Sequence, residues 1–247
     1  MTDNKSRIVY GVHTISNIIE SDKSKVKKIF FRKGELNKNL TNLHKKALNA
    51  GLYIEELETD QLTLLCESKR HQGIACEIID SNLSAFNLDN FLNLNNNPFI
   101  LMLDQIKDPN NLGACIRSAN AAGCDLVIKR KSNSSPISPA VHKASCGGTT
   151  GISIYETNDL NGIIKKLRSN NIYIIGTDHK AQANYSELKQ TNQTGVCIIM
   201  GSEDVGMSRS LKTKCDIMCS IPIKGTVDCL NISVACGIML YEVAKNR

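Results

Sequence analysis

From Phe99 onward, short apolar runs alternate with segments of helical spacing, and this alternation limits the possible folds more than any other feature of the chain. Runs such as Phe99 to Leu103 and Val196 to Met200 have the unbroken apolar character of strands buried on both faces of a sheet. Strands that alternate with helices of about ten residues predict a mostly parallel α/β sheet. We expect strands at 99–103, 126–129, 152–155, 172–176, 196–200 and 217–221, and helices at 112–122, 139–145, 160–170 and 230–243.

The first part of the chain shows the same alternation on a smaller scale. Residues 1–80 predict a compact α/β domain, and residues 98–247 predict the larger one. Between them, 81–97 reads S-N-L-S-A-F-N-L-D-N-F-L-N-L-N-N-N, which predicts a linker with one short helix at 89–94 and a boundary near residue 90. In the first domain we expect helices at 12–20, 40–50 and 60–66 and strands at 28–31, 52–57 and 73–79.

Composition narrows the class of protein. A net charge of +6 modestly favours an anionic partner, while the absence of Trp and the five Phe argue against a stacking platform for single-stranded nucleic acid. Most of the ten Cys lie in apolar runs, and the close pair Cys215 and Cys219 has no nearby His, so we expect reduced thiols and no metal site. The N-terminal residues lack the apolar core of a signal peptide, and no run of 18 apolar residues occurs. We therefore expect an intracellular protein that does not enter membranes.

Two loops of the larger domain are expected to face one crevice at the carboxyl ends of its strands. The first follows Met200 and reads G-S-E-D-V-G-M, in which Ser202 to Asp204 would cap a helix that begins near Gly206. The second leads into Leu230-Asn231-Ile232-Ser233 at the start of an apolar helix. Ordinary tight turns explain Gly, Ser and Asn at such places equally well. Asn231 and Ser233 are not needed for amphipathicity, however, and this favours a polar ligand.

The loop after the first strand of this domain carries a candidate functional cation. Asp108-Pro109 turns the chain, Asn110 or Asn111 caps the next helix, and Gly113 allows another backbone to approach that helix closely. Arg117 follows one turn later on a helix that is otherwise apolar or small. A lone Arg on a helix is usually an ion-pair partner, but the lack of competing charge favours a functional role here.

A basic stretch is the leading candidate for phosphate contacts. Leu126 to Tyr155 contains no Asp or Glu, whereas it carries Lys129, Arg130, Lys131 and Lys143. This pattern favours RNA binding, with a solvated surface loop as the alternative. A second basic run, from Lys23 to Lys33, has the same two interpretations.

The common cofactor and catalytic fingerprints are absent from the sequence. No G-x-G-x-x-G follows a strand and no G-x-x-x-x-G-K-[ST] occurs, which argues against a dinucleotide site and excludes a P-loop. No Ser-His-Asp or Cys-His set stands out, and the five scattered His residues are expected to be structural or superficial.

Three stretches together resemble the ordered motifs of the SpoU, or TrmH, RNA 2'-O-ribose methyltransferases. They are N-N-L-G-A-C-I-R-S-A-N-A-A-G at 110–123, I-M-G-S-E-D-V-G-M at 199–207 and I-P-I-K-G-T-V-D-C-L-N-I-S-V-A at 221–235. Residues 7–79, with V-Y-G-V-H near the start and H-Q-G-I near the end, are similar to the small substrate-binding domain of one branch of this family. That branch methylates a guanosine ribose in large-subunit (23S) ribosomal RNA. Cys229 departs from the family pattern, which usually has Ser there, so the hydroxyl of that position is absent.

The resemblance implies properties that the pattern alone does not show. It implies a deep trefoil knot in the C-terminal domain, a pocket for S-adenosylmethionine formed by the knot, and a homodimer packed through it with each site completed across the interface. The cofactor would be held by Met200, Gly201, Ile221, Ile223 and Leu230. The target ribose would be surrounded by the catalytic set Arg117, Asn111, Glu203, Asn231 and Ser233. No metal is needed for this reaction.

Two other functions remain open at this point. One is methylation of transfer RNA by an enzyme of the same family. The other is a non-catalytic RNA-binding or ribosome-assembly role on the same fold. The separate first domain favours ribosomal RNA, and intact Arg117, Glu203 and Asn231 favour an enzyme. The resemblance implies a location in the cytoplasm, or in the matrix or stroma of an organelle of bacterial origin.

Overall fold

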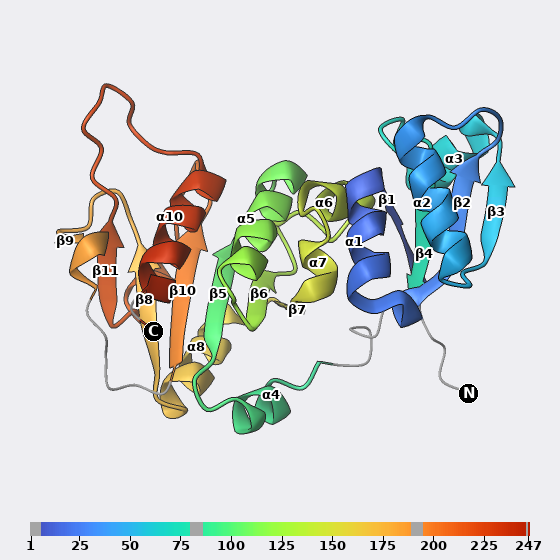
Figure 1. The fold of residues 1–247 in the computed structure, drawn as a ribbon. Helices are drawn as coiled ribbons and strands as arrows, with labels where there is room; N and C mark the ends of the chain where they lie inside the picture. Colours follow the sequence, from blue (N-terminus) through green and yellow to red (C-terminus); the bar gives the residue numbers. More distant parts are fainter. Residues whose placement is uncertain (1–5, 80–85, 189–194, 246) are drawn as a thin grey trace.

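The computed structural model describes residues 6–79, 86–188, 195–245 and 247, which form two α/β units with separate sheets (Figure 1). In the first unit, β4 lies between β1 and β2 and pairs antiparallel with both, while β3 pairs parallel with β2. Its elements are β1 Ser6–Tyr10, α1 Val12–Asp22, η1 Lys23–Lys25, β2 Val26–Arg32, α2 Lys38–Asn49, β3 Ile54–Leu57, α3 Thr59–Cys66 and β4 Ile74–Ile79.

The second unit contains a seven-stranded sheet in the order β7-β6-β5-β10-β8-β11-β9, and all of its strand pairs are parallel. The predicted parallel α/β sheet is thereby confirmed. Its elements are α4 Leu88–Leu94, β5 Phe99–Asp104, α5 Pro109–Ala121, β6 Leu126–Arg130, α6 Pro139–Ala144, α7 Gly148–Gly151, β7 Ser153–Thr157, α8 Leu160–Ser169, β8 Ile172–Thr177, β9 Ala183–Asn184, η3 Tyr185–Glu187, β10 Gly195–Gly201, α9 Arg209–Lys212, β11 Ile217–Ser220 and α10 Ile232–Lys245.

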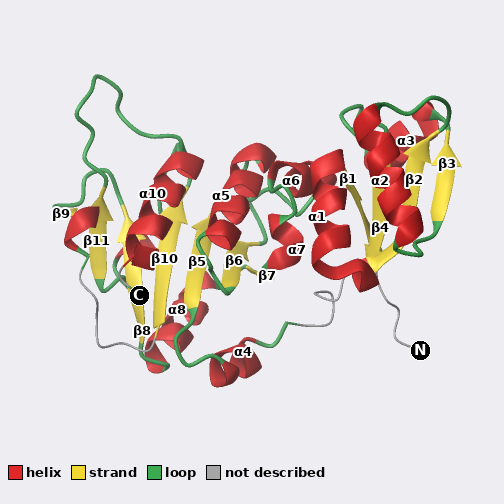
Figure 2. Ribbon diagram, viewed as in Figure 1, coloured by secondary structure: helices red, strands yellow, loops and turns green. Residues whose placement is uncertain are grey.

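Helices cover both faces of this sheet, as the unbroken apolar strands require (Figure 2). Alternate residues of β5 face opposite layers, with Leu101 and Leu103 packed against α5 and α10. Ile100 and Met102 pack in the other layer, which contains α4 and α8. Every residue of β5 is buried. The central strands are therefore fixed by two independent apolar layers.

Helix α4 packs with the second unit. Leu88 and Leu92 are buried in the same core cluster as Ile100 and Leu167. The range predicted as a linker, 81–97, therefore contains a helix that packs with the larger unit, while the division of the chain at 80 and 98 stays a prediction. The short helix expected at 89–94 is present.

The close approach predicted at Gly113 is confirmed. A Cβ atom at Gly113 would lie 2.4 Å from Ala144 Cβ and 2.8 Å from the Val141 carbonyl oxygen, so α5 and α6 touch through backbone at this point. Gly148 makes a similar approach from α7, because a Cβ there would lie 3.2 Å from Arg117 Cα. Both contacts lie on α5, which carries two of the candidate catalytic residues.

One predicted helix is misplaced. Residues Ser202 and Gly206 form an isolated bridge that closes a turn, and α9 begins only at Arg209 after the N-cap Ser208. The Gly at 206 has a φ of 70°, which suits a turn and does not suit a helix. The loop after β10 is consequently longer than the sequence predicts.

Within the described ranges, no helix is both long enough and apolar enough to span a bilayer.

Candidate active site

A cavity opens at the carboxyl ends of three neighbouring parallel strands, β8, β10 and β11. The empty space in this cavity, together with the open solvent at its mouth, amounts to about 920 Å³. Three peptide segments form its wall: residues 177–179 after β8, 200–206 after β10, and 219–223 after β11. The start of α10 closes the remaining side.

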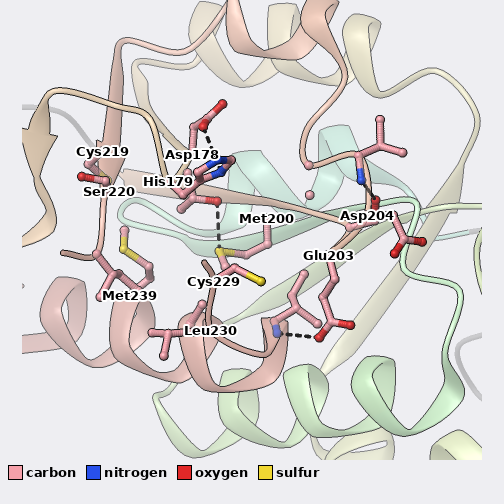
Figure 3. Close-up of a pocket in the computed structure, with 18 of the residues that line it drawn as sticks. Asp178, His179, Met200, Glu203, Asp204, Cys219, Ser220, Cys229, Leu230 and Met239 are labelled. Carbon is pink, nitrogen blue, oxygen red and sulfur yellow. Dashed lines mark hydrogen bonds and ion pairs between the residues drawn. The ribbon is translucent and has the colours of Figure 1, made fainter. Parts of the chain in front are cut away.

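All five residues predicted to hold a cofactor line this cavity. Met200 and Gly201 end β10, and Ile221, Ile223 and Leu230 lie on the chain between β11 and α10. Figure 3 shows Met200, Leu230 and Met239 beside the same space. The wall therefore offers apolar side chains for a flat ring and a thioether chain. It also offers backbone groups of strand ends for hydrogen bonds.

Gly201 is needed for the shape of this wall. A Cβ atom there would lie 2.0 Å from the backbone nitrogen of Met207 and 2.1 Å from the carbonyl carbon of Gly206. The turn that follows β10 folds directly back over Gly201, and any side chain would displace it. The cavity keeps its form because this residue has none.

A polar network joins the start of α5 to two loops beside the cavity. Asn111 Nδ2 donates to Glu203 Oε1 at 3.3 Å, and Asn231 Nδ2 donates to Asn111 Oδ1 at 3.1 Å. Glu203 also accepts from the Ile232 backbone N–H at 2.9 Å, an interaction drawn in Figure 3. Three of the predicted catalytic residues, from segments far apart in the sequence, therefore lie in direct contact.

Asn231 and Ser233 fit both interpretations given to them above. Asn231 Oδ1 accepts from Ser233 Oγ at 2.6 Å and from the Ser233 backbone N–H at 2.9 Å, which caps the start of α10. The amide nitrogen of Asn231 meanwhile reaches Asn111. Asn231 thus caps a helix and links that helix to the polar network.

Arg117 lies apart from the wall of the cavity. It sits six residues after Asn111 on α5, about 9 Å further along the helix. Its side chain is exposed, and Nη1 donates to Cys146 Sγ at 3.5 Å. The structure therefore brings together Asn111, Glu203, Asn231 and Ser233, but it holds Arg117 at the loop between α6 and α7.

The predicted RNA contact of Lys129 is wrong. Lys129 is fully buried, and its Nζ lies 2.6 Å from Glu156 Oε1 on the neighbouring strand β7. Arg130 is also engaged, since its Nε lies 2.7 Å from the buried Asp104 Oδ1. Asp104 in turn accepts from the Ser208 backbone N–H at 3.0 Å, so this pair anchors the start of α9. Both side chains serve the fold of the sheet.

The other basic residues predicted to contact RNA differ in whether their side chains are free or already bonded to protein groups. Lys131 is exposed at the end of β6, and its RNA contact stays a prediction. Lys143 donates to the Arg70 carbonyl oxygen at 2.7 Å and so joins the two units. In the run from Lys23 to Lys33, several ammonium groups pair with carboxylates, which favours a solvated face: Lys27 with Glu77, Lys28 with Glu55, and Lys33 with Glu58.

The cavity also contains residues that the sequence did not single out. Asp178 and His179 follow β8 and line the wall (Figure 3). Burial opposes ionisation of Asp178, but hydrogen bonds from Lys212 and the Lys180 backbone outweigh it and lower the pKa of this carboxyl. The position of Asp178 and His179 directly after a predicted parallel strand could have indicated that they line a ligand site. His179 is exposed, as expected of a surface residue, and it also lines the cavity, which the sequence did not predict.

The thiols are mostly buried, as their apolar settings predicted. Seven of the ten Cys are buried, and burial raises the pKa of Cys66 to about 11 and that of Cys76 to about 12. Cys229 is exposed and lines the cavity. The residue that replaces the usual Ser therefore faces the candidate ligand.

Comparisons with known proteins cover both units. Residues 98–241 match the family model of the SpoU rRNA methylase family, and residues 8–83 match the model for RNA 2'-O ribose methyltransferase substrate binding. A protein of Coxiella burnetii, named 23S rRNA (guanosine-2'-O-)-methyltransferase RlmB, is 35% identical over 246 residues, covering 98% of this chain and 97% of its own. The protein of the same name from Escherichia coli K12 is 32% identical over 243 residues, covering 98% and 99%.

Solved structures share the fold over nearly the whole chain. The SpoU methyltransferase AviRb from Streptomyces viridochromogenes, in complex with the cofactor AdoMet, superposes with a TM-score of 0.76 at 22% identity, covering 97% of this chain and 90% of its own. A crystal structure titled RNA 2'-O ribose methyltransferase gives a TM-score of 0.78 at 21% identity, covering 99% and 90%. At this level of identity the superpositions establish the two-unit architecture.

Proposed function

This chain belongs to the SpoU rRNA methylase family, and we propose that it transfers the methyl group of S-adenosylmethionine to the 2'-hydroxyl of a guanosine in 23S ribosomal RNA. The relatives named for this activity align over both units and not over the catalytic unit alone. The observation that carries the proposal is the contact of Asn111, Glu203 and Asn231 beside a cavity whose wall fits the cofactor.

The residues of the cavity suit S-adenosylmethionine. When bound, this cofactor supplies a methyl group on a sulfonium, which a ribose oxygen attacks from the opposite side. Met200 and Ile223 would lie against the adenine, while Gly201, Ile221 and Leu230 would hold the cofactor largely through backbone groups. Asp178 and His179 add polar groups at the end of β8.

The polar network would orient the target ribose. Both hydrogen bonds that Glu203 accepts go to Oε1, which fixes the direction of its second carboxylate oxygen. Asn111 is in turn held by Asn231, so an amide and a carboxylate are presented together. Groups locked by such mutual bonds lose little entropy when they align a hydroxyl.

Arg117 would act through its charge. A guanidinium does not release its proton, so it serves as a cation that stabilises developing negative charge on the ribose oxygen or fixes the neighbouring phosphate. It would do so in a homodimer packed through the second unit, with each site completed across the interface. This arrangement accounts for a position of Arg117 outside the cavity of its own chain.

An exposed apolar face supports the homodimer. Val234 and Tyr241 are 51% and 57% exposed and lie seven residues apart on α10, hence on one face of that helix. Val205, on the loop after β10, is 68% exposed. Exposed apolar side chains grouped near a site are typical of protein interfaces.

The path of the chain supports the proposed trefoil knot. After β11, residues 221–231 run as a long and mostly exposed segment, and α10 then returns to pack on α5 and β10 at the centre of the sheet (Figure 1). A C-terminal segment that comes back to the middle of a sheet is the course that such a knot requires. The cofactor cavity lies where this segment crosses the strand ends.

The first unit would bind the RNA substrate, together with Lys131 on the second, and the enzyme would work in the cytoplasm. The test is an in vitro reaction with purified protein, labelled cofactor and 23S rRNA that lacks the modification. Digestion and mass spectrometry of the nucleosides should yield 2'-O-methylguanosine. Methylation of transfer RNA instead, or cofactor binding without transfer to any RNA, would contradict the proposal and favour one of the two alternative functions.

A further inference from the structure

The first unit holds the loop between α6 and α7 of the second. Asn17, on α1, donates through Nδ2 to the Cys146 carbonyl oxygen at 2.8 Å. Lys25 Nζ donates to the Thr150 carbonyl oxygen at 3.3 Å, and Lys143 reaches back to the carbonyl oxygen of Arg70. Three hydrogen bonds to backbone thus join the units around one short segment.

The same loop holds Arg117. Arg117 Nη1 donates to Cys146 Sγ at 3.5 Å, so Cys146 contacts the first unit through its backbone and Arg117 through its side chain. Gly148, at the start of α7 directly after this loop, packs on the backbone of Arg117. Cys146 and Gly147 have φ values of 50° and 94°. A loop held in this region of φ depends on its neighbours to stay there.

The identity of the acceptor matters for the charge of Arg117. Within the described ranges, no carboxylate lies at ion-pair distance from this guanidinium. A thiol is a weak acceptor, which directs one N–H without neutralising the cation. A carboxylate in place of the Cys146 thiol would cancel the positive potential of Arg117, which the proposed reaction needs. Without a partner, the side chain of an exposed Arg would sample many rotamers.

We propose that Asn17 and Cys146 are positioning residues for Arg117, through which the first unit contributes to the methyl-transfer step as well as to RNA binding. The inference rests on the proposed catalytic role of Arg117. Asn17 holds the loop, the loop presents the sulfur of Cys146, and the sulfur sets the direction of the guanidinium. Loss of either contact leaves the cavity intact but releases the cation.

The test uses the full-length protein and separates turnover from binding. Asn17→Asp is nearly isosteric but replaces the amide donor by an oxygen, so the bond to the Cys146 carbonyl is lost. Cys146→Ala removes the acceptor, and Cys146→Ser restores one. We expect kcat to fall about tenfold or more in Asn17→Asp and Cys146→Ala, because small misplacements of a catalytic group have effects of this size. The KM for RNA and the affinity for S-adenosylmethionine should stay within about twofold, and Cys146→Ser should recover most of the rate.

Two controls make the result specific. Ser16→Ala changes the neighbouring residue on α1, whose hydroxyl bonds to Glu20 in the same helix, and should leave kcat unchanged. In an Arg117→Ala background, Asn17→Asp should have no further effect, because contacting groups that act as one unit are not additive. Wild-type kcat in Asn17→Asp, or a raised KM alone, would overturn the inference. Full activity of Arg117→Ala would instead overturn the proposed role of Arg117 itself.

Discussion

At the scale of single residues, some side chains of the site shape the cavity, and others present polar groups that a substrate could contact. Gly201 and Asn231 act on structure, the first by leaving room for a turn and the second by capping α10. Glu203 and Asn111 present polar groups beside the cavity. Among the residues that the structure describes, the side-chain partner of Arg117 is the thiol of Cys146, which is consistent with a cation kept available.

Replacing Arg117 by Ala should therefore lower kcat and spare the cofactor. Loss of one well-placed electrostatic group typically costs about a hundredfold or more in rate. Titration calorimetry should give an affinity for S-adenosylmethionine within a few fold of wild type, while a methyl-transfer assay reports the loss. Arg168→Ala, on helix α8, breaks a pair with Asp216 in the loop before β11; it is the charge-matched control and should remain active. Turnover of Arg117→Ala above about a tenth of wild type would rule out the role.

His142 should make stability depend on pH. Burial lowers the pKa of this imidazole well below its ordinary value, and the charge of Arg7 adds to the effect. The unfolded chain then binds a proton that the folded protein does not. Stability is full above about pH 6.5 and falls as the pH drops from there towards the folded pKa, by at most about 1.4 kcal/mol per unit.

Urea unfolding at pH 8.0, 6.5 and 5.5 measures this slope in wild type and in His142→Gln. The variant starts from a lower stability, since it loses the bond between Nδ1 and Thr149 Oγ1 of 2.6 Å. Its decline between pH 6.5 and 5.5 should nevertheless be shallower. Equal slopes in the two proteins would show that His142 titrates normally.

At the scale of elements, α5 is positioned by backbone contact on one flank and by α10 on the other. Gly113 lets α6 approach, and Gly148 brings α7 against the backbone of Arg117. Gly237 of α10 faces Ser118 of α5 at an ordinary distance, since a Cβ there would lie 3.8 Å from Ser118 Oγ. A side chain at Gly113 would therefore clash with α6, whereas one at Gly237 would fit.

Gly113→Ala should destabilise the protein and Gly237→Ala should not. Alanine favours a helix by about 1 kcal/mol over glycine, but overpacking against α6 costs about 1–3 kcal/mol or more because the obstructing atoms include backbone. At Gly237 the favourable contribution stands alone. Thermal unfolding of the two variants should move the midpoint in opposite directions, and a stabilised Gly113→Ala would mean that α6 yields easily.

The sequence specified some elements well and misled on others for physical reasons. β5 and β10 were recognised because strands buried on both faces are apolar throughout. β1 was missed, since it is short and half exposed, and α7 spans too few residues for a helical period to appear. The acid-free stretch ended at Tyr155, yet the next residue is Glu156, which pairs with Lys129 across β6 and β7. Register between strands is not visible along the chain.

At the scale of the whole molecule, the arrangement of units sets which parts of the site one chain can complete. The five residues predicted to hold the cofactor line one cavity, because segments that follow parallel strands meet at one edge of the sheet. The position of Arg117 relative to the cavity could not be predicted from strand ends. It depends on the loop between α6 and α7 and, in the proposed homodimer, on a second copy of the chain. Sequence spacing contains neither.

Mixing two inactive variants tests completion across the dimer. We consider a mixture of Arg117→Ala and Glu203→Ala subunits and suppose that Arg117 acts on the cavity of the other subunit. In each mixed dimer, one site then combines the intact Glu203 of one subunit with the intact Arg117 of the other. Random exchange should then restore about a quarter of wild-type activity, because half of the dimers are mixed and each has one working site. If both residues act within one chain, every site lacks one of them and no activity returns. A Tyr241→Lys background, which charges the apolar face of α10, should abolish the recovery.

The strand order also sets a delay during synthesis. β5 pairs with β6 on one side and with β10 on the other, but β5 ends at Asp104 and β10 begins only at Gly195. At about 5–20 residues per second, a growing chain carries an unpaired apolar edge for roughly 5 to 20 seconds before its partner strand exists. Such an edge is a template for aggregation. Chains that stop translation inside this interval should be insoluble, whereas chains that stop just after the first unit should not.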